Sequence, residues 1–257
     1  MGLGLTWWPF LRTVGSDNPR LRLTRHTHMT AALHLISSMA TKKLLADLIE
    51  HYRGVAPQAV VLEAVGGVDA ARRVAAGELF DGVALAAKAI DELIAAGHIV
   101  AGSRVDLVKS GVSVAVRAGA PQPGIGSEEA VKQAVLAART ISYSTGPSGE
   151  HLAKLFERWG IAAALKGRIV QAPPGVPVGS LVANGEVELG FQQYSELMGL
   201  PGISVLGPLP AAIQIITTFS AGVAASSTQP DAVRALLAFM ASPAVAAIKQ
   251  RHGMQPA

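Results

Sequence analysis

The chain has 257 residues, of which 50% are hydrophobic and 5% aromatic, with no cysteine and a formal net charge of +4. This length allows one large domain or two smaller ones, and the missing cysteines exclude disulfides and thiolate chemistry. The first 28 residues carry four arginines and one aspartate, so the remainder is too balanced in charge for a nucleic-acid surface. No apolar run approaches the ~20 residues of a membrane span, so we expect no membrane insertion.

Residues 1–28 read differently from the rest of the chain. They place no basic residue before the short apolar run, and no small-residue cleavage site follows it closely. A secretory signal needs both features. We therefore expect residues 1–28 to be a disordered or non-native extension, and the sequence as it stands favours a cytoplasmic location.

Strand-like and helix-like patterns alternate from Met29 onward. Strands are predicted at 31–37, 59–65 and 81–87, and a helix follows each of them. The helix after the first strand places its large apolar side chains on one face, namely Leu44, Leu45, Leu48, Ile49 and Tyr52. This β-α-β-α-β order predicts a mostly parallel sheet with helices on both faces.

A second α/β unit is predicted to begin near Val112. Its expected strands are 112–119, 139–144, 167–172, 186–193 and 202–207. An apolar segment, 213–226, and one long helix over 230–253 then return to the first unit. The predicted division is an extension (1–28), lobe 1 (29–110 and 206–257) and lobe 2 (111–205), with hinges near 108–114 and 205–222.

Three loops rich in Ser, Thr or Gly follow predicted strands and enter helices: "SSMAT", "VGGVD" and "SYSTGPSG". Ligands of open α/β sheets bind outside the carboxyl ends of strands. The unpaired N–H groups of a helix start and nearby hydroxyls suit an anion. The alternative is that these loops are ordinary helix caps, since Ser, Thr and an early Pro are common there.

Several longer stretches carry a resemblance to a known family, among them "ISYSTGPSGEHLAKLFERWGI", "DLVKSGVSVAVRAG" and "GFQQYSE". From Met29 to its end the chain resembles the molybdate-type periplasmic substrate-binding proteins, and specifically a divergent branch that includes aconitate isomerase. The resemblance implies an α/β, type II periplasmic-binding-protein-like fold. Two lobes with a hinge would enclose an interlobe ligand cleft, with no cofactor and no metal.

The resemblance also implies which residues contact the ligand. In the molybdate-binding members two hydroxyls, two helix-start amides and a tyrosine hold the oxyanion. Here Ser38 occupies the first hydroxyl position, whereas Gly66 or Gly67 replaces the second and Gln193 replaces the tyrosine. These replacements disfavour molybdate and favour a carboxylate. The complete predicted ligand-binding set is Ser37, Ser38, Gly66, Gly67, Thr145, Ser148, Gly149, Val176, Gln193 and Tyr194.

Two functions remain open at this stage. The first is a solute-binding protein of an ABC importer, which would bind a small anion and, if exported to the periplasm as the family usually is, dock on an ABC permease. The second is an aconitate-isomerase-like enzyme that moves a proton on a small unsaturated polycarboxylate. His151 and Glu196 would be its catalytic residues, with Arg72 or Arg73 neutralising a carboxylate.

Overall fold

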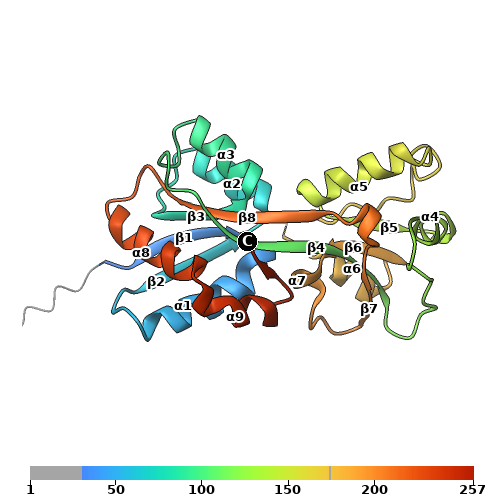
Figure 1. Ribbon diagram of the computed structural model, residues 1–257. Coiled ribbons are helices and arrows are strands. Elements are labelled where there is room, and N and C mark those ends of the chain that lie inside the picture. The colour runs from blue at the N-terminus through green and yellow to red at the C-terminus, as the bar shows by residue number, and fades with distance from the viewer. Residues whose placement is uncertain (1–30, 174) are drawn as a thin grey trace, which may run out of the picture. The chain divides into compact units, whose positions relative to one another are not determined.

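The computed structural model describes residues 31–173 and 175–257, so the predicted extension 1–28 lies outside the described residues. Strands and helices alternate through the chain (Figure 1). The strands are β1 (Leu33–Ser38), β2 (Val60–Val65), β3 (Gly82–Ala86), β4 (Val105–Arg117), β5 (Ile141–Tyr143), β6 (Leu189–Gln193), β7 (Ile203–Pro208), β8 (Ile216–Val223) and β9 (Gln255–Pro256). The α-helices are α1 (Lys42–Arg53), α2 (Gly67–Ala75), α3 (Ala87–Ala95), α4 (Glu128–Ala137), α5 (Pro147–Arg158), α6 (Val178–Asn184), α7 (Tyr194–Leu197), α8 (Pro230–Ala241) and α9 (Ala246–Arg251). Three 3₁₀ turns are η1 (Met39–Thr41), η2 (Ala211–Ile213) and η3 (Pro243–Val245).

Lobe 1 is built on the strand order β2-β1-β3-β8 (Figure 1). Strand β1 pairs in parallel with β2 and β3, and β3 pairs antiparallel with β8. Helices α1 and α8 pack their apolar faces into one core, and α2 and α3 pack into the other. Helices on both faces explain why β1 and β3 read as nearly continuous apolar runs.

Lobe 2 is built on β5, β6, β7 and the second half of β4. Helices α4 and α5 pack on these strands in the larger core of the lobe, in which Phe156 lies edge-on against Phe191 with ring centroids 6.3 Å apart. Helix α6 packs into a smaller core with Val187. Helix α4 begins after an N-cap at Ser127, whose hydroxyl accepts a hydrogen bond from the Ala130 N–H at 3.1 Å.

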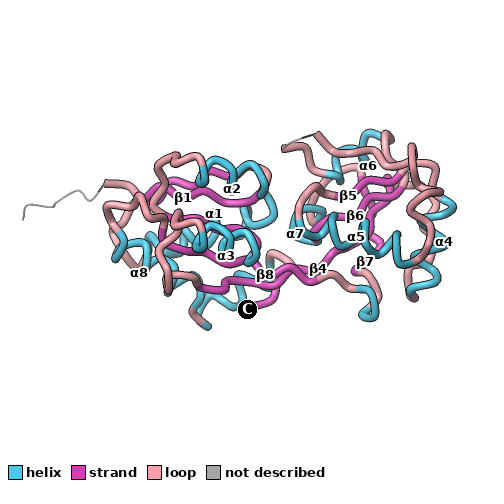
Figure 2. Tube along the Cα trace, turned by 90° about the horizontal axis from the view of Figure 1, so that it is seen from above, coloured by secondary structure: helices cyan, strands magenta, loops and turns pink. Residues whose placement is uncertain are grey.

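Strands β4 and β8 pass between the two lobes (Figures 1 and 2). Residues 105–111 of β4 pair with β8, whereas residues 112–117 pair with β6 and β7. The Gln214 side chain reinforces this crossing, because its Oε1 accepts from the Val112 N–H at 3.0 Å. The two predicted α/β lobes are therefore present. The hinge positions stay predictions. The core of lobe 2 extends past residue 205 and includes Leu209 and Ile213.

The strands of the predicted β-α-β-α-β segment, β1, β2 and β3, pair in parallel as expected. The complete sheet is mixed, because β8 returns from the second lobe antiparallel to both β3 and β4. Two sequence predictions about the elements are wrong. The segment 167–172 forms only an isolated bridge between Ile169 and Ile141. The terminal helix breaks at Pro243, since a residue before proline favours extended backbone and Ser242 adopts ψ 152°.

No single helix among the described residues is long and apolar enough to cross a membrane, although α8 and the segment 243–251, bent by 56°, pass that test when taken together. The apolar side chains of α8 lie in the core of lobe 1, among them Val233, Leu236 and Met240. The hydropathy of this helix is therefore accounted for by packing within the fold.

Candidate functional site

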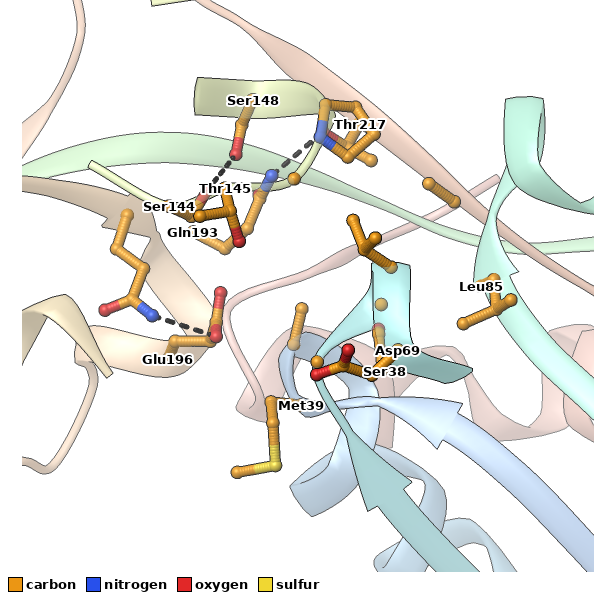
Figure 3. A pocket seen from close by; sticks show the side chains of 18 of the residues that line it. Ser38, Met39, Asp69, Leu85, Ser144, Thr145, Ser148, Gln193, Glu196 and Thr217 are labelled. Carbon is orange, nitrogen blue, oxygen red and sulfur yellow. Dashed lines mark hydrogen bonds between the residues drawn. The ribbon is translucent and has the colours of Figure 1, made fainter. Parts of the chain in front are cut away.

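A cleft of about 650 Å³ lies between the lobes, and the three predicted loops all contribute to its wall. Residues 38–40 follow β1, residues 66–69 follow β2, and residues 144–148 follow β5. Each of these segments leaves the carboxyl end of a parallel strand and enters a helix. Figure 3 shows Ser38 and Asp69 on one side of the cleft and Ser144, Thr145, Ser148, Gln193 and Glu196 on the other.

Helix starts dominate the wall. The N-terminal turns of α2, α3, α5 and α6 all line the cleft. The starts of α2, α3 and α5 carry no side-chain cap from the described residues, and the N-cap of α5 is Gly146 rather than a serine or threonine. The start of α6 is capped, because Gln192 Oε1 accepts from the Gly179 N–H. The first-turn N–H groups of α2 and α3 and the Ser148 N–H of α5 therefore lie at the cleft without a capping side chain, and the helix dipoles add partial positive charge there. This arrangement favours an anion over the ordinary-cap alternative.

Hydroxyl groups supplement these N–H groups on both sides. The Ser144 and Ser148 Oγ atoms are hydrogen-bonded at 3.0 Å, so one of the two hydrogens remains for another acceptor. Ser38 Oγ lies 3.4 Å from Thr41 Oγ1, a long and weak contact. Both Ser38 and Ser148 are buried. They can therefore donate to a ligand without competing with bulk water.

Two glutamines at the end of β6 form the back of the cleft. The Gln192 Oε1 accepts from the Gly179 N–H at 3.2 Å, and its Nε2 donates to Glu196 Oε1 at 2.9 Å. The Gln193 Nε2 donates to Thr217 Oγ1 at 2.8 Å. Because the α6 N–H fixes the direction of the Gln192 amide, Glu196 receives a defined donor and keeps a second oxygen for the cleft.

Glu196 is the titratable group that the cleft perturbs most. Burial raises the pKa of Glu196 to about 7, and the hydrogen bond from Gln192 lowers this pKa by a smaller amount. The side chain is partly buried and points toward the cleft (Figure 3). A carboxyl group with such a pKa exchanges protons readily near neutral pH, as a general acid or base must.

Cations are scarce in the cleft wall. Lys88 lines it, but its Nζ lies 3.7 Å from Glu92 Oε1, and Glu92 lines the cleft too. Arg72 pairs with Asp69 at 2.6 Å. Arg73 pairs with Glu63 and Glu78 and lies 5.4 Å from the Phe80 ring centroid, so it holds α2 to the sheet instead. Neither predicted arginine lines the cleft, and an anion must rely chiefly on N–H and hydroxyl donors.

The structure brings most of the predicted site residues together. Those that line the cleft are Ser38, Gly66, Gly67, Thr145, Ser148, Val176, Gln193 and Glu196. Their roles as ligand contacts stay predictions, because geometry shows only that they share one cavity. The remaining four, Ser37, Gly149, His151 and Tyr194, do not line it.

Each of these four has a structural reason to lie elsewhere. Ser37 precedes Ser38 in β1, so its side chain points to the opposite face, where it is fully buried. Gly149 packs on the Ser144 carbonyl, and an added Cβ would lie 1.6 Å from that oxygen. The Tyr194 ring packs against Gly253. His151 Nδ1 lies 2.8 Å from the Pro147 carbonyl oxygen, and the side chain faces a separate groove between α5 and 212–215.

Sequence reasoning missed several lining residues, including Asp69, Lys88, Glu92, Glu150 and Thr217. Thr217 comes from β8, which carries no glycine- or serine-rich loop signal of the kind that marked the other segments. The acidic residues lie inside helices, where charged side chains are usually solvated. No group of three or more His, Asp or Glu side chains suited to a metal ion occurs in residues 31–173 and 175–257.

Comparison with known proteins places the chain in a family. The family model for bacterial extracellular solute-binding proteins matches residues 33–255. The chain belongs to this family. It is 37% identical over 223 residues to an aconitate isomerase of a Pseudomonas species, covering 85% of this chain and 84% of that protein.

Solved structures agree with this assignment. The Azotobacter vinelandii periplasmic molybdate-binding protein superposes with a TM-score of 0.72 at 20% identity, covering 86% of this chain and 98% of the other. The sulfate-binding protein of Mycobacterium tuberculosis gives a TM-score of 0.73 at 16% identity, covering 88% and 87%. The predicted type II periplasmic-binding-protein fold and the family resemblance are confirmed. Sequence identities of 16–20% show that the fold is shared, but they do not show that the same ligand is bound.

Proposed function

We propose that this solute-binding protein binds a small di- or tricarboxylate in the cleft between its lobes. The observation that carries the proposal is the convergence of three helix starts without a side-chain cap, those of α2, α3 and α5, on one cavity. Each start offers N–H donors and partial positive charge to an anion. As a binder the protein would deliver this ligand to an ABC permease, which requires an exported form.

The size and the lining of the cleft favour a carboxylate over a compact oxyanion. A dehydrated tetrahedral oxyanion needs donors closely spaced around it. Here Gly66 and Gly67 offer no hydroxyl, and Gln193 directs its N–H toward Thr217. The cavity of about 650 Å³ leaves room for several carboxylate groups, each on its own helix start. The aconitate isomerase relative supports a ligand of this class.

A second candidate, isomerase activity on such a ligand, is favoured by Glu196. In its ionised form Glu196 would take a proton from the methylene carbon beside a carbon–carbon double bond. The electron pair left behind would shift the double bond by one position, and Glu196 would return the same proton to the far end of the allylic system. The helix-start N–H groups would stabilise the negative charge that develops on the ligand.

Calorimetric titration of the full chain with trans-aconitate, citrate, molybdate and sulfate tests the binding proposal. We expect the two carboxylates to bind more tightly than either oxyanion. Micromolar binding of molybdate or sulfate, with no heat from the carboxylates, would contradict the proposal. Binding raises the melting temperature too, because the ligand stabilises only the folded state, so a thermal scan provides an independent readout.

Proton NMR of the protein with trans-aconitate separates binder from enzyme. Turnover would appear as new vinyl and methylene signals, and transfer to deuterium oxide would reveal exchange at carbon. The matched pair of variants is Glu196→Gln, which removes the candidate base, and Glu150→Gln, which removes a charge at the exposed rim of the same cleft. Loss of turnover in Glu196→Gln alone supports the isomerase, whereas an unchanged ligand spectrum with the unaltered protein supports the binder.

A further inference from the structure

Only one of the two polar atoms of the Gln193 side-chain amide has a hydrogen-bond partner among the described residues. Its Nε2 donates to Thr217 Oγ1 at 2.8 Å, whereas its Oε1 has no hydrogen-bond partner among the described residues. Gln193 is 4% exposed and lies in the cleft wall beside Thr217 (Figure 3). A buried carbonyl oxygen without a donor is costly, and such atoms are rare in folded proteins. The Gln193 side chain lines the cleft, although Oε1 itself is buried in this structure, so a ligand that exposes this oxygen by turning the side chain would supply the missing donor.

We propose that Gln193 determines the specificity of the cleft by accepting a hydrogen bond from a hydroxyl group of the ligand. The inference rests on the proposed function and deepens it, since it narrows the ligand class from carboxylates to hydroxycarboxylates. Helix starts supply donors for the carboxylate oxygens, whereas the Gln193 Oε1 can only accept. A carboxylate oxygen placed against Oε1 would be repelled, so this position requires an O–H group.

Thr217 determines which atom of the Gln193 amide is left without a partner. Strand β8 holds its hydroxyl 2.8 Å from Gln193 Nε2, and this contact defines which amide atom remains. The reversed amide would accept from Thr217 and present its N–H groups to the ligand. That arrangement would favour a carboxylate oxygen at the same position and would give a hydroxyl no advantage. The two orientations therefore predict different ligand preferences.

Citrate and tricarballylate form a matched pair of probes, because they differ by a single hydroxyl group. Calorimetric titration of the full chain should show citrate binding at least tenfold more tightly than tricarballylate. Equal affinity for both would overturn the inference while leaving the carboxylate-binding function intact. Failure of both to bind would overturn the proposed function, and this inference with it.

Two variants test whether Gln193 causes the preference for citrate over tricarballylate. Gln193→Met keeps the length of the side chain and removes the acceptor, so the citrate preference should fall to about twofold or less. Gln171→Met is the matched control, because Gln171 lies at the exposed rim of the same cleft and donates to the Tyr143 carbonyl. It should keep the full preference. A citrate preference that survives in Gln193→Met would overturn the inference.

Thr217→Val tests the orientation of the amide without altering Gln193. Loss of the threonine hydroxyl frees the amide to rotate, so the citrate preference should shrink by several-fold while tricarballylate affinity is kept or improves. Thermal melting checks that each variant is folded before titration. The citrate-to-tricarballylate ratio within a single folded variant is then independent of small changes in stability. An unchanged ratio in Thr217→Val would contradict the role given to this contact.

Discussion

The two walls of the cleft use different parts of the chain to meet a ligand. The lobe 1 wall contains the starts of α2 and α3, with the small residues Gly66, Gly67, Ala86 and Ala89 around them. The lobe 2 wall adds the polar side chains Ser144, Thr145, Ser148, Gln192, Gln193 and Glu196. Main-chain N–H groups treat most small anions alike, whereas placed side chains discriminate between them. On the proposed function, lobe 1 would supply general anion affinity, and lobe 2 would supply selectivity and any chemistry.

The largest expected effect comes from a glycine that shapes the lobe 2 wall. In Gly149→Ala the new Cβ would lie 1.6 Å from the Ser144 carbonyl oxygen, which is main chain and cannot move aside cheaply. We expect a loss of roughly 3 kcal/mol in unfolding free energy, or a Tm lower by roughly 6–12 °C. Thermal melting measures this loss, and ligand binding should fall with it because Gly149 lies in the first turn of α5.

Gly67→Ala is the matched control on the lobe 1 wall. Its Cβ would lie 3.5 Å from the Ser38 Cβ, which is an ordinary van der Waals contact. We expect a Tm change of no more than about 2 °C, since a surface change without strain is usually within ~0.5 kcal/mol. If both variants melted alike, the lobe 2 wall would not depend on close packing at Gly149.

Ser38→Ala tests the general anion affinity of the lobe 1 wall. A hydrogen bond to a charged group contributes about 1.5–3 kcal/mol, so affinity should fall roughly 10- to 150-fold. Because Ser38 is expected to contact a carboxylate oxygen in any case, citrate and tricarballylate should weaken by the same factor. Titration of both ligands checks this. A change in their ratio would show that lobe 1 discriminates between ligands as well.

Glu196→Gln tests how the charge of the lobe 2 wall depends on pH. The pKa of Glu196 is raised to about 7 by burial, so the side chain gains a negative charge as pH rises through 7. In the unaltered protein, affinity for a carboxylate should fall roughly tenfold between pH 6 and pH 8 by repulsion. In Glu196→Gln the affinity should be nearly constant between pH 6 and pH 8. Calorimetric titration of both proteins at several pH values measures the difference.

The raised pKa of Glu196 also predicts how the stability of the folded protein depends on pH. A pKa raised in the folded state means that the folded protein binds the proton more tightly than the unfolded chain. Its contribution is therefore fully present below the ordinary glutamate range and is lost as pH rises through about 7. The variant Glu196→Gln should lose less Tm between pH 5 and pH 8 than the unaltered protein. A steeper loss in the variant would show that Glu196 is ionised well below pH 7.

The sequence predicted the fold and the position of the cleft because both follow from local patterns. The apolar periodicity of the helix over 42–53 and the runs around 33–38 and 82–86 identified elements that the structure contains. The loops after three of the strands were recognisable because parallel strands end at one edge of the sheet. The return of the segment 213–226 to lobe 1 was predicted, but the antiparallel direction of β8 was not, because strand direction leaves no mark on local periodicity.

Side-chain direction was harder to predict than loop position. Gln193 and Thr217 lie 24 residues apart on different strands, and only the folded structure shows their hydrogen bond. The raised pKa of Glu196 likewise depends on burial by the completed cleft. His151 shows the opposite failure, since it lies near the site in sequence but on the outer side of α5 in the structure. Proximity along a helix does not place two side chains on one face.

His151→Ala should therefore have the smallest effect. The His151 ring contacts the Pro147 carbonyl and lines the outer groove with Lys154 and Arg158, away from the cleft that Ser148 lines. We expect carboxylate affinity and any turnover to change less than about twofold, since the residue shares no cavity with Glu196 or Gln193. Titration and proton NMR of the variant provide the measurement. A hundredfold loss of turnover would mean that α5 rotates His151 toward the ligand, and the division of roles between the walls would then include the outer face of this helix.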